Sequence, residues 1–140
     1  MADRLTLEVA TPSRSIISEQ VDEVVVPGVE GYFGVLPGHA PLLSTLGIGD
    51  LTYRFGRDER HVAVAGGFCE VRNDKVIVLA DTAELPQEID RARAERARDR
   101  AEQPLTGRSG EDVDYTRASA ALARALNRLQ VHGALTEEAP

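Results

Sequence analysis

The sequence predicts an α+β protein, in which an N-terminal antiparallel β-sandwich is followed by a C-terminal antiparallel two-helix hairpin. Two features predict this fold. Up to residue 84, apolar residues alternate with polar ones in short runs separated by Gly, Pro, Asn and Asp, which is typical of strands joined by tight turns. Beyond residue 84, Ala, Arg and Glu predominate, and all three favour helices. We therefore expect a sandwich domain over residues 1–84 and a helical domain over residues 85–140.

The alternating runs predict roughly eight to ten short strands in the sandwich domain. Because side chains of a strand point alternately to its two faces, such a run buries one face and leaves the other exposed. Asn73 and Asp74 mark a tight turn between two runs. The clearest runs are residues 5–9, 24–26, 51–55, 62–64 and 76–80.

The first helix is expected over residues 89–102. Pro86 suits its first turn, where the missing N–H of proline costs nothing. Pro104 and the glycines after it are expected to end this helix.

The second helix is expected over residues 112–131, with Gly133 as its stop and residues 136–140 frayed. Its apolar residues are spaced alternately by three and four, so they form one stripe. Much of this stripe is alanine, which buries little area, so we expect a weakly held hairpin that can detach from its contacts. The stripe consists of Tyr115, Ala118, Leu122, Ala125 and Leu129.

Composition excludes several classes of function. The net charge of −7 argues against nonspecific nucleic-acid binding, which needs a basic surface. We expect no transmembrane helix and no signal peptide, so any membrane association is expected to pass through a partner. The single cysteine, Cys69, lies in a strand-like run and is expected to be a buried, reduced thiol.

The most specific segment is residues 30–43, EGYFGVLPGHAPLL, which we call the Gly-Pro segment. Pro37 and Pro41 are expected to stiffen it. A stiff loop that projects from a sandwich suits a docking surface. Three glycines are expected to supply backbone angles that other residues avoid, namely Gly31, Gly34 and Gly38.

His39 within this segment raises the question of catalysis. No serine or cysteine nucleophile with an orienting acid accompanies it, so a structural or interface role is favoured. The histidines at 39, 61 and 132 show no metal-ligand spacing, and we expect no metal site. The segment is not a phosphate-binding loop either, because it lacks the Gly-Lys-Ser/Thr ending and does not open a helix.

Arginines recur on both expected helices. Asp90, Arg93, Ala97 and Arg100 share one face of the first helix, and a similar stripe on the second includes Arg124. An antiparallel hairpin of these helices can aim several guanidinium groups at one point, and such groups match phosphate oxygens. The alternative is a solvated helix surface with i,i+4 ion pairs such as Arg91 with Glu95.

The Gly-Pro segment and three further runs resemble the epsilon subunit of rotary F-type ATP synthases over almost the whole chain. The further runs are residues 64–71, 78–83 and 112–115. The resemblance implies a noncatalytic rotor subunit of the F1 sector, whose sandwich couples the gamma subunit of the stalk to the proton-driven c-ring. The interface residues that it implies are Gly31, Tyr32, Phe33, Gly34, Pro37, Gly38 and His39.

The resemblance also implies that the hairpin regulates ATP hydrolysis, switching between a folded state and a state extended toward the catalytic alpha and beta subunits. Residues 89–94, IDRARA, resemble a motif that binds ATP in some bacterial epsilon subunits. ATP is then a regulatory ligand, and no cofactor is required. The implied ATP-binding residues are Glu84, Ile89, Asp90, Arg93, Ala94, Arg100, Arg124 and Arg128.

The implied location is the cytoplasmic face of a bacterial plasma membrane, where the chain is held through its partners. Two other classes remain open on sequence grounds. One is a free-standing nucleotide-sensing module on a sandwich scaffold, and the other is a small enzyme that uses His39.

Overall fold

The computed structural model describes residues 4–106 and 115–138 of the 140-residue chain. The chain separates into two compact units, residues 1–85 and residues 86–140, which we call the sandwich unit and the helical unit. The division between Leu85 and Pro86 falls one residue after the domain boundary expected from the sequence.

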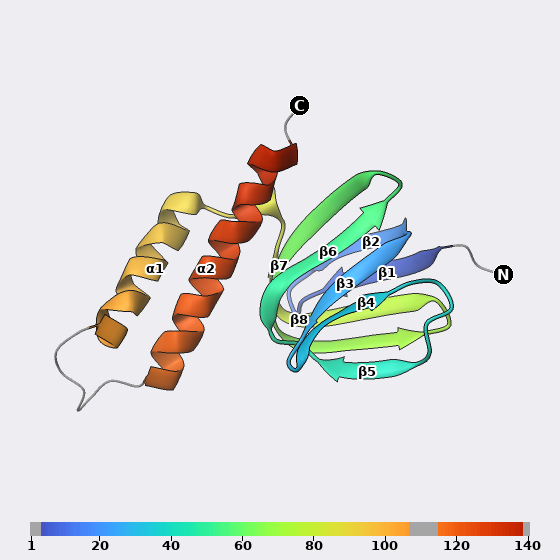
Figure 1. Cartoon of the computed structure of the whole chain (residues 1–140), viewed down its shortest axis with the longest axis horizontal. Coiled ribbons are helices and arrows are strands. Elements are labelled where there is room, and N and C mark those ends of the chain that lie inside the picture. The colour runs from blue at the N-terminus through green and yellow to red at the C-terminus, as the bar shows by residue number, and fades with distance from the viewer. Residues whose placement is uncertain (1–3, 107–114, 139–140) are drawn as a thin grey trace. The chain divides into compact units, whose positions relative to one another are not determined.

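The sandwich unit is built from strands β1 to β8, which together form the predicted sandwich-type sheet (Figure 1). The strand order is β2-β1-β8-β7-β6-β3-β4, and β5 pairs with β7. The strand bounds are β1 Leu5–Ala10, β2 Ser15–Val21, β3 Glu23–Gly28, β4 Gly31–Val35, β5 Leu42–Thr45, β6 Ile48–Phe55, β7 Asp58–Arg72 and β8 Lys75–Glu84.

The pairing between β1 and β8 is parallel, whereas a fully antiparallel sandwich was expected. Hairpins impose antiparallel pairing on strands that a tight turn connects, as between β7 and β8. No such turn connects β1 and β8, which lie at opposite ends of the unit's sequence, so their relative direction is set by packing.

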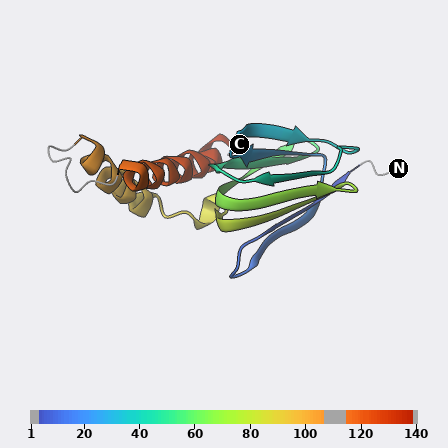
Figure 2. The same ribbon diagram turned by 90° about the horizontal axis from the view of Figure 1, so that it is seen from below.

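Strand β7 bends and takes part in both layers of the sandwich (Figure 2). Its first half pairs with β6, from Asp58 to Ala65, and its second half pairs with β5, from Phe68 to Val71. The bend falls at Gly66 and Gly67, whose φ angles are 71° and 109°. Other residues seldom adopt such angles, so the glycine pair allows one strand to cross between layers.

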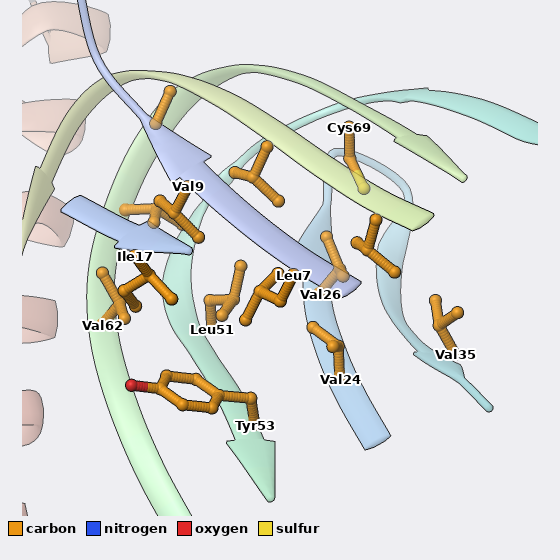
Figure 3. Close-up of a cluster of buried hydrophobic side chains, with 14 of the residues drawn as sticks. Leu7, Val9, Ile17, Val24, Val26, Val35, Leu51, Tyr53, Val62 and Cys69 are labelled. Carbon is orange, nitrogen blue, oxygen red and sulfur yellow. The ribbon is translucent and has the colours of Figure 1, made fainter. Parts of the chain in front are cut away.

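The core between the layers follows the period of two that the sequence shows (Figure 3). Leu5, Leu7 and Val9 are fully buried on β1, and the residues between them are half-buried. Cys69 is also buried, as predicted, and burial raises the pKa of its thiol to about 12. The thiol therefore stays protonated at neutral pH and behaves as a small apolar side chain.

The helical unit contains the short 3₁₀ helix η1 (Pro86–Glu88) and the helices α1 (Arg91–Thr106) and α2 (Tyr115–Glu138). Helices α1 and α2 run antiparallel and pack against each other, which confirms the predicted hairpin (Figure 1). Asp90 caps α1, because its Oδ1 atom accepts a hydrogen bond from the backbone N–H of Arg93 at 3.1 Å. The buried positions are mainly small: Ala94, Ala101, Ala125 and Ala134, with Ile89 and Val131.

Two predicted helix ends are wrong. Helix α1 continues two residues beyond Pro104, since a proline near the end of a helix removes only one late hydrogen bond. Helix α2 continues through Gly133 to Glu138, so residues 136–138 are helical rather than frayed. Gly133 does not adopt the positive φ of a glycine cap. The expected start of the second helix, residues 112–114, and the tail residues 139–140 lie outside the described residues.

Candidate functional site

The Gly-Pro segment is two strands and a short loop, so the prediction of a single projecting loop is wrong. Residues 31–35 form β4, which pairs with β3 after the two-residue turn of Val29 and Glu30. Leu42 and Leu43 begin β5, which pairs with β7 in the other layer. The segment therefore runs from an edge strand of one layer to an edge strand of the other, and residues 36–41 connect them.

Only part of the expected glycine geometry is present. Gly31 and Gly38 have positive φ angles of 134° and 88°. Gly34 lies in β4 with ordinary strand geometry, so the expectation for this residue is wrong. A Cβ atom on Gly34 would meet no other atom within 4 Å, and the position therefore tolerates a side chain.

Residues 36–39 form a tight turn, which we call the docking turn after the role expected of the Gly-Pro segment. The His39 N–H donates to the carbonyl oxygen of Leu36 at 3.1 Å, and Pro37 and Gly38 occupy the two central positions. Proline followed by a glycine of positive φ is the pattern of a type II turn. A depression of about 290 Å³ lies beside the turn and is lined by Glu23, Gly34, Leu36, Pro37, Gly38 and His39.

The imidazole of His39 serves its own loop. Its Nδ1 atom lies 2.6 Å from the carbonyl oxygen of Ala40. Because a carbonyl oxygen only accepts hydrogen bonds, Nδ1 carries the proton in this contact. This local bond fits the structural or interface role that the sequence favoured for His39.

The two aromatic residues of β4 have different surroundings. Phe33 is half-buried and packs against the core. Tyr32 is 58 % exposed, and its hydroxyl oxygen accepts a hydrogen bond from the backbone N–H of Asp50 at 3.1 Å. The carboxylate of Asp50 lies 2.9 Å from Nδ1 of His61, and burial is the main cause that raises the pKa of this carboxyl group.

A second surface feature, which sequence reasoning missed, is an exposed apolar patch on the outer face of β5, β7 and β8. Leu43, Phe68 and Leu79 are 69 %, 57 % and 57 % exposed, and we call them the apolar patch. Phe68 lies directly opposite Leu79 in the sheet, and Leu43 is a diagonal neighbour of Phe68. They alternate with buried residues such as Cys69 and Val78. The signal for this patch in the sequence was that consecutive residues of these strands are apolar, so that both faces of each strand carry apolar side chains.

On the helical unit, the arginines of the expected ATP site occupy related positions. Arg93 and Arg100 each precede a buried alanine of α1. Arg124 and Arg128 each precede a residue of the α2 stripe. In an antiparallel pair, positions that directly precede interface residues lie on the same side of both helices, so these four arginines share one side of the hairpin. Arg93, Arg100 and Arg124 are exposed and Arg128 is half-buried.

The other expected ATP-site residues play varied parts. Ile89 and Ala94 are buried, so their side chains contribute to packing rather than to the surface. Asp90 caps α1, and Glu84 ends β8 in the sandwich unit. Helix α1 also has the solvated ion pairs that were the alternative to an ATP site. Arg91 and Glu95 form the predicted i,i+4 ion pair, with Nε of Arg91 2.9 Å from Oε1 of Glu95.

Residues 4–106 and 115–138 hold neither a metal-binding cluster nor a membrane-spanning helix. Within these ranges, the structure contains no group of three or more His, Cys, Asp or Glu side chains placed to bind a metal ion. None of the described helices combines the length and the apolar character that crossing a membrane requires.

Comparison with known proteins identifies the family. A family model described as the beta-sandwich domain of the ATP synthase delta/epsilon chain matches residues 4–86. A second, described as the long alpha-helix domain of the same chain, matches residues 87–133.

Individual proteins agree with the family models. The chain is 53 % identical over 133 residues to an ATP synthase epsilon chain of Nitratidesulfovibrio vulgaris, covering 95 % of this chain and 98 % of the relative. It is 50 % identical over 138 residues to the ATP synthase epsilon chain of Geobacter metallireducens, covering 99 % of this chain and 100 % of the relative. A chain in a solved structure of Euglena gracilis mitochondrial ATP synthase shares the fold, with a TM-score of 0.75 and 22 % identity. The match covers 97 % of this chain and 83 % of that chain. The chain therefore belongs to the family of F-type ATP synthase epsilon chains.

Proposed function

We propose that this protein is a noncatalytic rotor subunit that couples proton flow to ATP synthesis in a bacterial ATP synthase. The sandwich unit docks through the apolar patch on the gamma subunit and through the docking turn on the c-ring. The subunit thereby lies at the cytoplasmic face of the plasma membrane without entering the bilayer. The observation that carries this proposal is the apolar patch of Leu43, Phe68 and Leu79.

The physical argument rests on the cost of exposing this patch. Folded proteins seldom leave contiguous apolar groups in water unless these bind a partner. Fully burying one large apolar side chain is worth about 1.5–3 kcal/mol, so a partner that covers Phe68 and Leu79 gains much of its affinity from them. The patch lies on regular strands, which offer a rigid surface.

We expect Phe68→Ser to weaken capture of the purified gamma subunit by the full chain by roughly 30-fold, the scale of an interface hot spot. The matched control is Phe55→Ser, because Phe55 is also an exposed phenylalanine, 45 % exposed, at the end of β6. Surface-immobilised chain and titrated gamma subunit measure both affinities. Equal losses for the two variants, or no capture of gamma by the unaltered chain, would contradict the proposal.

We also propose that the helical unit opposes ATP hydrolysis by extending toward the alpha and beta subunits, and that ATP favours its folded state. Four arginines on one side of the hairpin support an anion site, because guanidinium groups match phosphate oxygens in geometry and charge. A ligand shifts a two-state equilibrium only through its preference for one state. An ATP site made of both helices exists only in the folded hairpin, so ATP stabilises that state.

For the ATP site, the expected result is that the double variant Arg93→Ala/Arg100→Ala binds ATP at least about tenfold more weakly than the unaltered chain, since it loses two charged hydrogen-bond donors. Arg91→Ala is the matched control, because it removes an arginine of α1 whose guanidinium already pairs with Glu95. Calorimetric titration of the full chain with ATP measures all three affinities. The site is refuted if the double variant retains the affinity of the control.

A further inference from the structure

Asp74 connects three segments of the sandwich unit. It lies with Asn73 in the two-residue turn between β7 and β8, where both residues have positive φ angles, 50° and 59°. Its carbonyl oxygen accepts a hydrogen bond from the N–H of Thr6 at 2.9 Å, at the start of the β1–β8 pairing. Its carboxylate Oδ1 accepts a hydrogen bond from the backbone N–H of Gly38 at 2.6 Å. Asp74 thus joins the β7–β8 hairpin to the docking turn, 36 residues away in the sequence.

The bond to Gly38 holds the middle of the docking turn. The turn closes through Leu36 and His39, so the Gly38 N–H takes no part in the closing bond and donates to Asp74 instead. An ionised carboxylate is a stronger acceptor than a neutral group, and the short distance fits such a bond. The edge strands on either side of the turn belong to different layers of the sandwich, so strand pairing alone does not define where the turn lies.

We propose that Asp74 is a positioning residue for docking, which holds the turn of residues 36–39 in the orientation that the c-ring recognises. The inference rests on the proposed function, because it assigns the docking turn to the ring and the apolar patch to gamma. Leu36, which is 53 % exposed, is the large apolar side chain that this turn presents. Asp74 lies outside the Gly-Pro segment, and its side chain supports the turn from a neighbouring hairpin.

Two substitutions separate this role from the ordinary role of a turn residue. Asp74→Gly keeps the hairpin, because Asn-Gly is a preferred pair for a two-residue turn with positive φ angles, but it removes the carboxylate. Asp74→Asn keeps both the turn preference and a side-chain oxygen that can accept from Gly38. A purely structural role in the hairpin predicts that both variants behave alike.

The test uses the full chain in both variants. In the NMR spectrum, Asp74→Gly is expected to shift the Gly38 amide resonance upfield and speed its hydrogen exchange, while Asp74→Asn stays close to the unaltered chain. Capture of purified c-ring is expected to fall about tenfold with Asp74→Gly and to be restored within about twofold by Asp74→Asn. Capture of gamma is expected to be unchanged by either substitution.

Each contrary outcome has a distinct meaning. An unchanged Gly38 amide in Asp74→Gly overturns the hydrogen bond and with it the inference. A shifted Gly38 amide with undiminished ring capture overturns the positioning role alone and leaves the proposed function intact. Failure of the unaltered chain to capture the ring overturns the docking of the turn on the ring, and the positioning role falls with it.

Discussion

Gly67→Ala is expected to lower the free energy of unfolding of the sandwich unit by about 3 kcal/mol or more. Gly67 has a φ of 109°, which alanine avoids. An added Cβ atom would also overlap the carbonyl oxygen of Leu79 and approach the Cα atom of Ala80 to 2.8 Å. Both contacts are with backbone of the paired strand β8, so relief requires the two strands to separate.

Gly34→Ala is the matched control for this prediction. Gly34 also lies in a strand, but its φ is not positive and no atom lies within 4 Å of an added Cβ. We expect its effect to stay within about 0.5 kcal/mol. Urea denaturation followed by circular dichroism measures both variants. Equal stability of the two variants would show that the bend of β7 does not require glycine at position 67.

Truncation after Leu85 is expected to leave a folded sandwich that still captures gamma, and to raise ATP hydrolysis by the assembled complex. The sandwich unit has its own core, which includes Leu7 and Leu51 and is closed at the chain end by Leu85. The residues removed include the whole helical unit, which we propose opposes hydrolysis.

The separated helical unit, residues 86–140, is expected to lose most of its helix content. Its buried residues are mainly alanines such as Ala94, Ala101 and Ala125, each of which contributes only about 0.8 kcal/mol for its methyl group. Ordering the backbone of one residue costs about 1–2 kcal/mol of entropy. The apolar burial within the hairpin is therefore too small to hold the two helices together. Circular dichroism at 222 nm measures the helix content of this fragment. A fragment with native helix content and cooperative melting would contradict the argument, and unchanged hydrolysis by the truncated complex would contradict the inhibitory role.

Sequence periodicity was a good guide to the core and a poor guide to strand neighbours. Alternation at Leu5, Leu7 and Val9 identified a strand with one buried face, because burial of one face is a local property of each strand. The parallel pairing of β1 with β8 joins the two ends of the sandwich unit, and no local pattern reports it. The presence of two helices was also predictable from the sequence. The prediction that the second helix stops at Gly133 was wrong, because glycine both caps helices and occurs within them.

For the candidate surfaces too, local sequence patterns identified the segments but not their neighbours in space. The Gly-Pro segment was recognisable as a specific segment, yet its division into β4, the docking turn and β5 depends on which strands lie beside it. The exposure of Phe68 and Leu79 follows from the register that places them opposite each other on the outer face, and the sequence analysis did not single them out. The bond between Asp74 and Gly38 joins residues far apart in the chain, so only the folded backbone reveals it.

By itself, the sequence determined the α+β class, the two-part organisation, the buried cysteine and the family resemblance, because each depends on local composition, periodicity or motif order. The tertiary structure decided the parallel strand pair, the crossing of β7 between layers at Gly66 and Gly67, the exposed apolar patch and the support of the docking turn by Asp74. These features depend on contacts between distant segments, and such contacts are selected by packing and hydrogen bonding across the whole sandwich rather than by any one stretch of residues.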